Sequence, residues 1–293
     1  MLPSGYRAFT AVVLSAGIAL LPVASSAAEE AHRIASSVVM FKTEGGARIT
    51  AHLVRPEGGD AVARPAVVAL HGCGGPVNRR GQLTERHADW ASRWVAAGYV
   101  VLFPDSFNSR GFREICTVPL DRRPIRSAER AVDVAAAAEW LAAQPFVDAT
   151  RMALVGWSHG GGTLLTAIRA GGPVANGRFK VAVAFYPGCR VPARDAGQGR
   201  FALAMPVSIL IGAADDWTPP VHCRQLARRV KGVELVEYAG AVHGFDSPAS
   251  RRRTRKDTGY AGARGVEVGT DPVARAAAIE LVTAKLAAAF AGR

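Results

Sequence analysis

A serine flanked by glycines offers the strongest chemical signal in this chain. Gly156, Ser158 and Gly160 form the pattern G-x-S-x-G, with an apolar run before it and further glycines and a helix-forming stretch after it. A strand, a sharp turn and a helix in this order present a serine hydroxyl as a nucleophile at the end of a parallel strand. The turn strains the serine backbone, so its neighbours need to lack side chains. We predict that Ser158 is a nucleophile; the alternative is a glycine-rich turn with no chemical role.

A serine nucleophile needs a base that accepts its proton, and the base needs a carboxylate that orients it. On an α/β-hydrolase sheet the nucleophile, the acid and the histidine follow one another in this order along the chain. Asp215 follows an apolar run that ends at Ile211, and His243 follows a run that ends at Tyr238. Both loops leave the carboxyl ends of predicted strands, where the sites of open α/β sheets lie. We predict that His243 is the base and that Asp215 is the acid.

Each of these two assignments has an alternative nearby in the sequence. His222 is a second candidate base, but it falls inside an expected helix, beside Cys223. Asp216 is a second candidate acid, one position after Asp215. We prefer Asp215 because it comes first after the strand, and the other aspartate is then expected to be a turn or cap residue.

Attack on a carbonyl creates an oxyanion, which needs two preorganised hydrogen-bond donors. The backbone N–H of His159, the residue after the serine, is the first candidate. The second is expected from the glycine-rich loop His71–Gly75, in which we favour the N–H of Cys73. A plain turn is the alternative for this loop. The Cys73 thiol is a further candidate nucleophile, but Ser158 fills that role better.

Alternating strands and helices are expected to position these loops. Short, continuous apolar runs predict strands that are covered on both faces, and helical periodicity or alanine-rich composition predicts the helices. This alternation predicts an α/β fold with a mostly parallel central sheet and helices on both faces. Strands are expected at Ser37–Phe41, Arg48–Val54, Pro65–Leu70, Tyr99–Phe103, Met152–Gly156, Val181–Phe185, Val207–Ile211 and Val233–Tyr238, and helices at Leu83–Ala97, Ser127–Ala143 and Asp271–Ala289.

The segment from 106 to 126 has no clear period, and long loops in compact domains are often functional. Its arginines could steer an anionic substrate, although solvated loop arginines are an equal alternative. Two tryptophans adjoin the predicted catalytic residues and are expected to contact substrate. The candidate substrate-binding residues are therefore Arg110, Arg113, Trp157 and Trp217, with Arg122 and Arg123 as further loop arginines.

A second long loop, from 247 to 270, carries the basic run 251–256 in a chain of net charge +12. Such a run can bind nucleic acid. Because neither an aromatic platform nor a nucleic-acid motif accompanies it, we interpret it as a solvated loop and expect no nucleic-acid partner.

The N-terminal 28 residues have the pattern of an export signal. Arg7 is their only charged residue, an apolar stretch runs from Ala8 to Ala24, and Ser26–Ala28 supplies a small-residue cleavage site. We predict a signal peptide at 1–28, which is cleaved, and a single domain at 29–293 that is periplasmic or secreted. An uncleaved membrane anchor is the alternative, but we expect no stable membrane insertion after cleavage.

The chain contains four cysteines, an even number that suggests disulfides in an oxidising compartment. We favour the pair Cys189–Cys223, since each follows a predicted strand end on the same side of the sheet. Cys73–Cys116 then follows by elimination. The cysteines lack the spacing of a zinc site, and we expect no bound metal.

In combination, these motifs resemble the dienelactone hydrolase family of α/β-hydrolases. The founding members use a cysteine nucleophile and place a glutamate in the oxyanion loop, whereas this chain has Ser158 and, at the matching loop position, Gly72. The resemblance therefore implies serine esterase or lactonase chemistry without a cofactor. The matching segments are His71–Gly75, Phe103–Asp105, Gly156–Gly161, Phe185–Gly188, Asp215–Pro219 and His243–Asp246.

The sequence thus predicts an exported serine hydrolase that cleaves a small-molecule carboxylic ester or lactone through an acyl-enzyme. A peptidase or an acyltransferase on the same fold is an alternative, because a triad fixes neither the leaving group nor the acceptor. A peptidase of the prolyl-oligopeptidase type usually carries an added propeller, for which this chain has no room. A binding protein that retains the fold without catalysis is the alternative from a different class.

Overall fold

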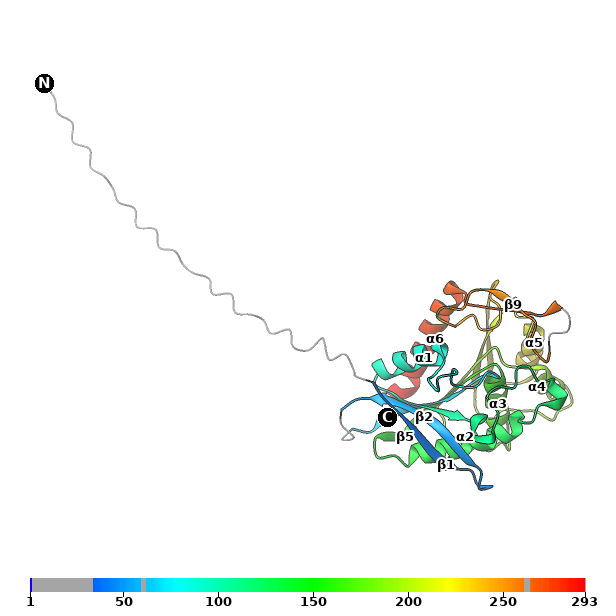
Figure 1. The fold of residues 1–293 in the computed structure, drawn as a ribbon, viewed down its shortest axis with the longest axis horizontal. Coiled ribbons are helices and arrows are strands. Elements are labelled where there is room, and N and C mark those ends of the chain that lie inside the picture. Colours follow the sequence, from blue (N-terminus) through cyan, green and yellow to red (C-terminus); the bar gives the residue numbers. More distant parts are fainter. Residues whose placement is uncertain (2–33, 59–61, 261–263, 293) are drawn as a thin grey trace. The chain divides into compact units, whose positions relative to one another are not determined.

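Within the described residues, eight strands form one mixed sheet in the order β1-β2-β4-β3-β5-β6-β7-β8 (Figure 1). The structure is a computed structural model that describes Met1 and residues 34–58, 62–260 and 264–292. β1 pairs antiparallel with β2, and β2 with β4, while the other neighbours pair in parallel. The strands are β1 (Ile34–Lys42), β2 (Arg48–Pro56), β3 (Arg64–Leu70), β4 (Val100–Asp105), β5 (Val147–Trp157), β6 (Val181–Phe185), β7 (Val207–Gly212) and β8 (Val233–Tyr238).

Helices cover both faces of this sheet (Figure 1). α1 and α6 lie together on one face, where Arg275 of α6 donates a 2.7 Å hydrogen bond to Asp89 of α1. α2 and α3 pack against each other on the opposite face. The helices are α1 (Glu85–Ala96), α2 (Ser127–Ala142), α3 (His159–Ala167), α4 (Arg190–Gly197), α5 (Pro220–Arg229) and α6 (Pro272–Ala291).

The central strands are buried along their whole length and mostly apolar because helices cover them on both sides. All residues of β4 and β7 are buried, so the strands show continuous apolar runs and not alternation. Trp90 of α1 packs between the rings of Trp94, Trp157 and Phe185. Trp157 is the last residue of β5, so this aromatic cluster adjoins the position of the candidate nucleophile, Ser158.

The predicted α/β fold with a mostly parallel sheet is confirmed, and the long unpatterned segments contain more structure than expected. Segment 106–126 holds two short 3₁₀ turns, at Asn108–Arg110 and Leu120–Arg122. Segment 247–270 contains a two-stranded ribbon of β9 (Arg253–Arg255) and β10 (Val266–Val268). Three-residue strands are too short to produce a readable period.

The four cysteines, all within the described residues, form two disulfides. Cys73–Cys116 joins the loop after β3 to the segment after β4, and Cys189–Cys223 joins the start of α4 to α5. This is the pairing expected from the sequence. The first disulfide ties down the loop after β3, which is the loop expected from the sequence to supply an oxyanion donor.

The predicted signal peptide, 1–28, lies outside the described residues except for Met1. None of the described helices has the length and apolar character that crossing a membrane requires. The described residues from Ile34 onward belong to one compact unit.

Candidate active site

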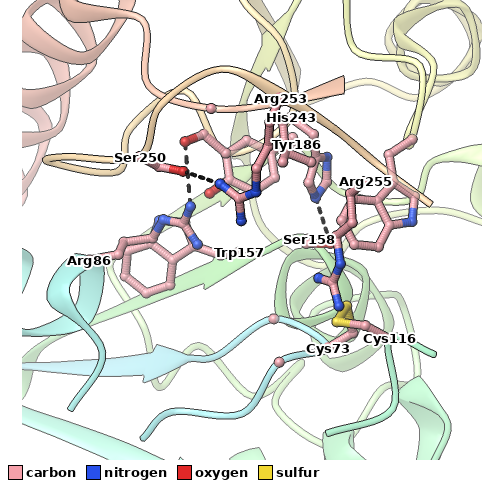
Figure 2. A pocket seen from close by; sticks show the side chains of 16 residues that line it. Cys73, Arg86, Cys116, Trp157, Ser158, Tyr186, His243, Ser250, Arg253 and Arg255 are labelled. Atoms are coloured by element: carbon pink, nitrogen blue, oxygen red, sulfur yellow. Dashed lines mark hydrogen bonds between the residues drawn. A yellow bond between two sulfur atoms is a disulfide. The ribbon is translucent and has the colours of Figure 1, made fainter. Parts of the chain in front are cut away.

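Ser158 lies at the tight turn between β5 and α3. Its backbone has φ 53° and ψ −114°, in a region that residues with a side chain rarely adopt. The turn is held by a hydrogen bond of 2.9 Å from the Ser158 N–H to the carbonyl of Phe185 on β6. Strain of this kind persists where the surrounding structure maintains it, and it presents the hydroxyl to the cavity in Figure 2.

The glycines around this serine are required by close backbone packing. A Cβ on Gly160 would overlap the carbonyl oxygen of Leu70, at the end of β3. A Cβ on Gly156 would lie 2.5 Å from the carbonyl oxygen of Gly160. The G-x-S-x-G pattern thus lets β3, β5 and the first turn of α3 approach closely enough to expose the serine.

Ser158, His243 and Asp215 form a continuous hydrogen-bonded series. His243 Nε2 lies 3.0 Å from Ser158 Oγ, and His243 Nδ1 lies 2.8 Å from Asp215 Oδ2 (Figure 2 shows the first of these bonds). The buried Asp215 carboxylate also accepts N–H bonds from Trp217 and Thr218 on Oδ1. A carboxylate only accepts, so Nδ1 carries the histidine proton and Nε2 is free to accept the serine proton.

The structure distinguishes between the two candidate acids and between the two candidate bases. Asp215 reaches His243, whereas Asp216 turns away and accepts the backbone N–H of Glu267 on β10 at 2.9 Å. His222 lies within α5, as expected, and it does not line the cavity around Ser158.

The two expected oxyanion donors lie beside Ser158. The loop after β3 passes so close that a Cβ on Gly72 would lie 3.5 Å from Ser158 Cβ. Cys73 lines the same cavity, and its carbonyl accepts the Ile115 N–H at 2.9 Å. His159 is the first residue of α3, so its N–H has no acceptor in a preceding helical turn. The His159 N–H is therefore available to a negatively charged oxygen, and the Cys73 N–H stays a prediction for the second donor.

A buried carboxylate, Asp246, organises the layer below the candidate triad. It is fully buried and accepts hydrogen bonds from Tyr186 Oη at 2.5 Å, Trp157 Nε1 at 2.7 Å and Trp90 Nε1 at 2.9 Å. Arg86 Nε lies 3.1 Å from Asp246 Oδ1 and supplies an opposite charge. This network was not predicted, although Asp246 belongs to one of the recognised motifs, because nothing in the sequence indicates its partners.

Tyr186 connects this network to the histidine. Its ring centroid lies 4.5 Å from that of His243, and its backbone has a positive φ of 36°. Burial raises the pKa of Tyr186 well above its ordinary value, so its hydroxyl stays protonated and keeps donating to Asp246. The Tyr186 ring thereby supports the orientation of His243.

A cavity of about 210 Å³ opens above Ser158 and His243 (Figure 2). Trp157 and Trp217 line it, as expected, although the Trp157 indole N–H is engaged by Asp246. The Trp217 ring packs 4.7 Å from the ring of His243. Arg86, Arg253 and Arg255 also line this cavity, which gives it a cationic wall.

The arginines expected to contact substrate lie elsewhere, which corrects the prediction. Arg110 forms an ion pair with the buried Asp133 at 2.7 Å and also donates to the Ser106 carbonyl. Arg113 lines an adjacent cavity of about 230 Å³, and neither arginine lines the one above Ser158. Five of the six residues in the basic run 251–256 are exposed, as expected for a solvated loop. The run also contains β9, and Arg253 and Arg255 line the Ser158 cavity.

Among the described residues, no group of three or more histidine, cysteine or acidic side chains is placed to hold a metal ion.

Comparison with known proteins agrees with this architecture. A candidate dienelactone hydrolase from Klebsiella pneumoniae subsp. pneumoniae has 18% identity and a TM-score of 0.62, over 89% of this chain and 100% of its own. The dienelactone hydrolase-like promiscuous phosphotriesterase P91 from metagenomic libraries has 22% identity and a TM-score of 0.58, over 88% and 99%. Thermogutta terrifontis esterase 2 has 17% identity and a TM-score of 0.57, over 86% and 93%.

Relatives at this level of identity show the fold that the chain shares with them. A search of curated proteins found no match. The model of the dienelactone hydrolase family, however, matches residues 49–288, which is most of the chain and includes every residue of the candidate site. The chain therefore belongs to the dienelactone hydrolase family of hydrolases.

Proposed function

We propose that this protein is an exported serine hydrolase that cleaves carboxylic esters or lactones through an acyl-enzyme. The observation that carries the proposal is the hydrogen-bonded series from Asp215 through His243 to Ser158. Both disulfides support an oxidising compartment, and hence export.

In the proposed reaction, Ser158 Oγ attacks the substrate carbonyl carbon while His243 Nε2 accepts the hydroxyl proton. Asp215 holds the Nδ1 proton and stabilises the imidazolium. The carbonyl oxygen becomes an oxyanion that accepts from the N–H groups of Cys73 and His159. Collapse of this intermediate breaks the bond to the alcohol oxygen, which takes the proton from His243. Water then attacks the acyl-enzyme by the same route and releases the acid.

Hydrolysis of short p-nitrophenyl esters, together with labelling by a fluorophosphonate, tests this proposal. We expect turnover, and we expect mass spectrometry to locate a single phosphonylated residue at Ser158. Turnover with the label on another residue would refute the assigned nucleophile. Absence of both turnover and label would favour a binding protein. A parallel assay with a peptide library and with alcohol acceptors distinguishes hydrolysis of esters from peptidase or acyltransferase activity.

Export can be tested by N-terminal sequencing of the protein recovered from its host. Cleavage after residue 28 is expected, because Ser26–Ala28 forms the small-residue exit of the apolar segment. A mature chain that still begins at Met1 would contradict the proposal.

The cationic wall indicates a preference for substrates with an anionic group. Arg255 is paired with Asp257 at 2.6 Å, and Arg86 with Asp246. Arg253 donates to Ser250 Oγ at 3.0 Å but has no carboxylate partner among the described residues (Figure 2). Its charge is thus available to a substrate carboxylate, which guanidinium groups bind through paired hydrogen bonds.

Replacing Arg253 with alanine should therefore affect charged and neutral esters differently. We expect kcat/KM for p-nitrophenyl hemisuccinate to fall about tenfold, the effect of losing one charge-assisted hydrogen bond. The value for p-nitrophenyl butyrate should stay within about twofold. Arg252→Ala, a neighbour that pairs with Glu267 outside the cavity, is the matched control. Equal losses for the two esters would contradict a role in anion recognition.

Removing the Cys73–Cys116 disulfide should lower kcat more than it raises KM. The disulfide fixes the Cys73 loop against the Ile115 segment, and small displacements of catalytic groups can cost up to about 100-fold in rate. We expect a loss of about tenfold to 100-fold in Cys73→Ala/Cys116→Ala, measured by steady-state kinetics on folded protein. The matched control is Cys189→Ala/Cys223→Ala, which removes a buried disulfide outside the cavity. Equal losses in the two double variants would indicate a general effect of destabilisation.

A further inference from the structure

A buried guanidinium links the two segments that supply the candidate oxyanion donors. Arg130 projects from α2 and is only 1% exposed. Its Nη2 donates to the carbonyl of His71 at 2.8 Å, and its Nη1 lies 2.7 Å from His159 Nδ1. One side chain thus bonds to the loop after β3 and to the first residue of α3.

The hydrogen bond from Arg130 determines the protonation state of the His159 ring. A guanidinium can only donate, so His159 Nδ1 must be an unprotonated acceptor. Burial, together with the charges of Arg130 and Arg123, holds the pKa of His159 well below its ordinary value. The ring stays neutral at physiological pH, and its bond to Arg130 restrains the residue whose N–H is the first candidate donor.

The bond to His71 acts on the other donor. His71 Nδ1 lies 2.7 Å from the carbonyl oxygen of Gly72, so Nδ1 carries the proton that it donates. This bond orients the peptide between Gly72 and Cys73, whose N–H is the second candidate donor. Arg130 also donates to the His71 carbonyl. The position of His71 is therefore restrained, and His71 in turn orients the peptide that carries the Cys73 N–H.

An aromatic ring completes the cluster. The Phe107 ring lies under the Arg130 guanidinium, at 5.0 Å, and its centroid lies 4.6 Å from that of His71 and 6.0 Å from that of His159. Phe107 is itself completely buried. The cation and both histidines therefore share one rigid support, which limits independent movement of the two donor segments.

Burial of the Arg130 charge is unfavourable for the free energy of folding. Burial lowers its pKa to about 9, and the carboxylates of Asp133 and Asp105 oppose this shift, so the group remains a cation at neutral pH. Asp133 forms its ion pair with Arg110, and Arg130 has no ion-pair partner among the described residues. Its Nε also has no hydrogen-bond partner in the described structure. A buried, unpaired charge destabilises the fold, and the cost is consistent with a role beside a developing oxyanion.

We propose that Arg130 is a positioning residue that holds the N–H groups of Cys73 and His159 in the relative positions that a single oxyanion hole requires. This inference rests on the proposed function. Arg130 acts through His71 and His159 and does not touch the substrate. Loss of Arg130 is expected to lower kcat, because the oxyanion forms only in the transition state. Substrate binding should change little, because the carbonyl is still uncharged at that stage.

The test compares Arg130→Met, Arg130→Lys and the control Arg229→Met in the full chain. Arg229 donates to the main-chain carbonyl of Ala193 at 3.0 Å, outside the Ser158 cavity. Folded active sites are counted by the end point of fluorophosphonate labelling, so that loss of folded protein does not lower the apparent kcat. Arg130→Lys keeps the charge but not the fork that reaches two acceptors.

We expect kcat for each labelled site to fall about 100-fold in Arg130→Met, with KM within about threefold of wild type. Arg130→Lys should lose less, and Arg229→Met should match wild type. Wild-type kcat in Arg130→Met, or a loss shared with Arg229→Met, would overturn the proposal. If Arg130→Met does not fold, His159→Ala removes one of the two bonds and is expected to lower kcat about tenfold with KM unchanged.

Hydrogen exchange separates failure of this inference from failure of the proposed function. The amides of His71–Gly75 and Ser158–Gly160 should exchange faster in Arg130→Lys or Arg130→Met and remain unchanged in Arg229→Met. This result is expected whether or not the wild-type protein turns over an ester. Unchanged exchange in both segments would refute the positioning role, while absence of wild-type turnover and label would refute only the hydrolase mechanism.

Discussion

The Ser158→Ala variant is expected to have a kcat about 10⁶-fold below that of the wild-type protein, the size of effect found when a serine nucleophile is removed from a triad. Without Oγ there is no atom to form the acyl-enzyme, and His243 has no hydroxyl proton to accept. Residual turnover should come from substrate binding and the oxyanion donors alone. Steady-state hydrolysis of a p-nitrophenyl ester, with fluorophosphonate labelling of the same preparation, measures both consequences.

Stability and binding should change little in this variant. The oxygen that is removed faces the cavity and His243, and the strained backbone is held by a bond from the Ser158 N–H, which alanine keeps. Ser37→Ala, at an exposed position on β1, is the matched control and should retain wild-type activity. A Ser158→Ala protein that still hydrolyses esters within about tenfold of wild type would show that another group is the nucleophile.

The features that could be predicted from the sequence are local ones. The strand, tight turn and helix around Ser158 could be predicted because the glycines that the turn requires all lie within a few residues of it. The sheet could be predicted for a similar reason, since continuous apolar runs indicate strands that are covered on both faces. The order of acid and histidine then follows from the fold.

The features that could not be predicted depend on contacts between distant segments. Arg110 is 23 positions from the Asp133 carboxylate that binds it, and nothing in loop 106–126 indicates this partner. The sequence does not indicate that Arg253 and Arg255 line the Ser158 cavity, because the β9–β10 pairing that places them there involves only three residues on each side. A basic run without apolar alternation carries no sign of a strand.

The buried residues that support the site could not be predicted from the sequence either. Asp246 accepts bonds from residues 60, 89 and 156 positions away, on separate elements of the fold. Arg130 lies in an alanine-rich helix, where an arginine would ordinarily be assigned to the solvent face. Only the packing of α2 against the loop after β3 reveals that its side chain is buried.

A matched pair of variants tests whether Asp215 or the adjacent Asp216 is the acid of the triad. Asp215→Asn is expected to lower kcat about 10⁴-fold, with little change in KM, as when the triad aspartate of a serine protease is replaced. Asp216→Asn should stay within about twofold of wild type. Its amide oxygen can still accept the Glu267 N–H, so the contact with β10 is retained.

The large effect expected at Asp215 follows from how its two oxygens are used. Oδ1 accepts the N–H groups of Trp217 and Thr218, at 2.9 Å and 2.8 Å, so an asparagine must keep its carbonyl oxygen there. Its NH₂ group then occupies the place of Oδ2, facing His243 Nδ1. Because both would be donors, the ring must shift its proton to Nε2. Nε2 can then no longer accept the Ser158 proton.

This mechanism makes a further distinction possible by NMR. In Asp215→Asn, the ¹⁵N resonances of the His243 ring should report protonation at Nε2, the reverse of the wild-type tautomer. A loss of activity without this reversal would indicate that the carboxylate acts mainly through its charge. A loss confined to Asp216→Asn would transfer the role of the acid to Asp216, against the geometry in which only Asp215 reaches the histidine.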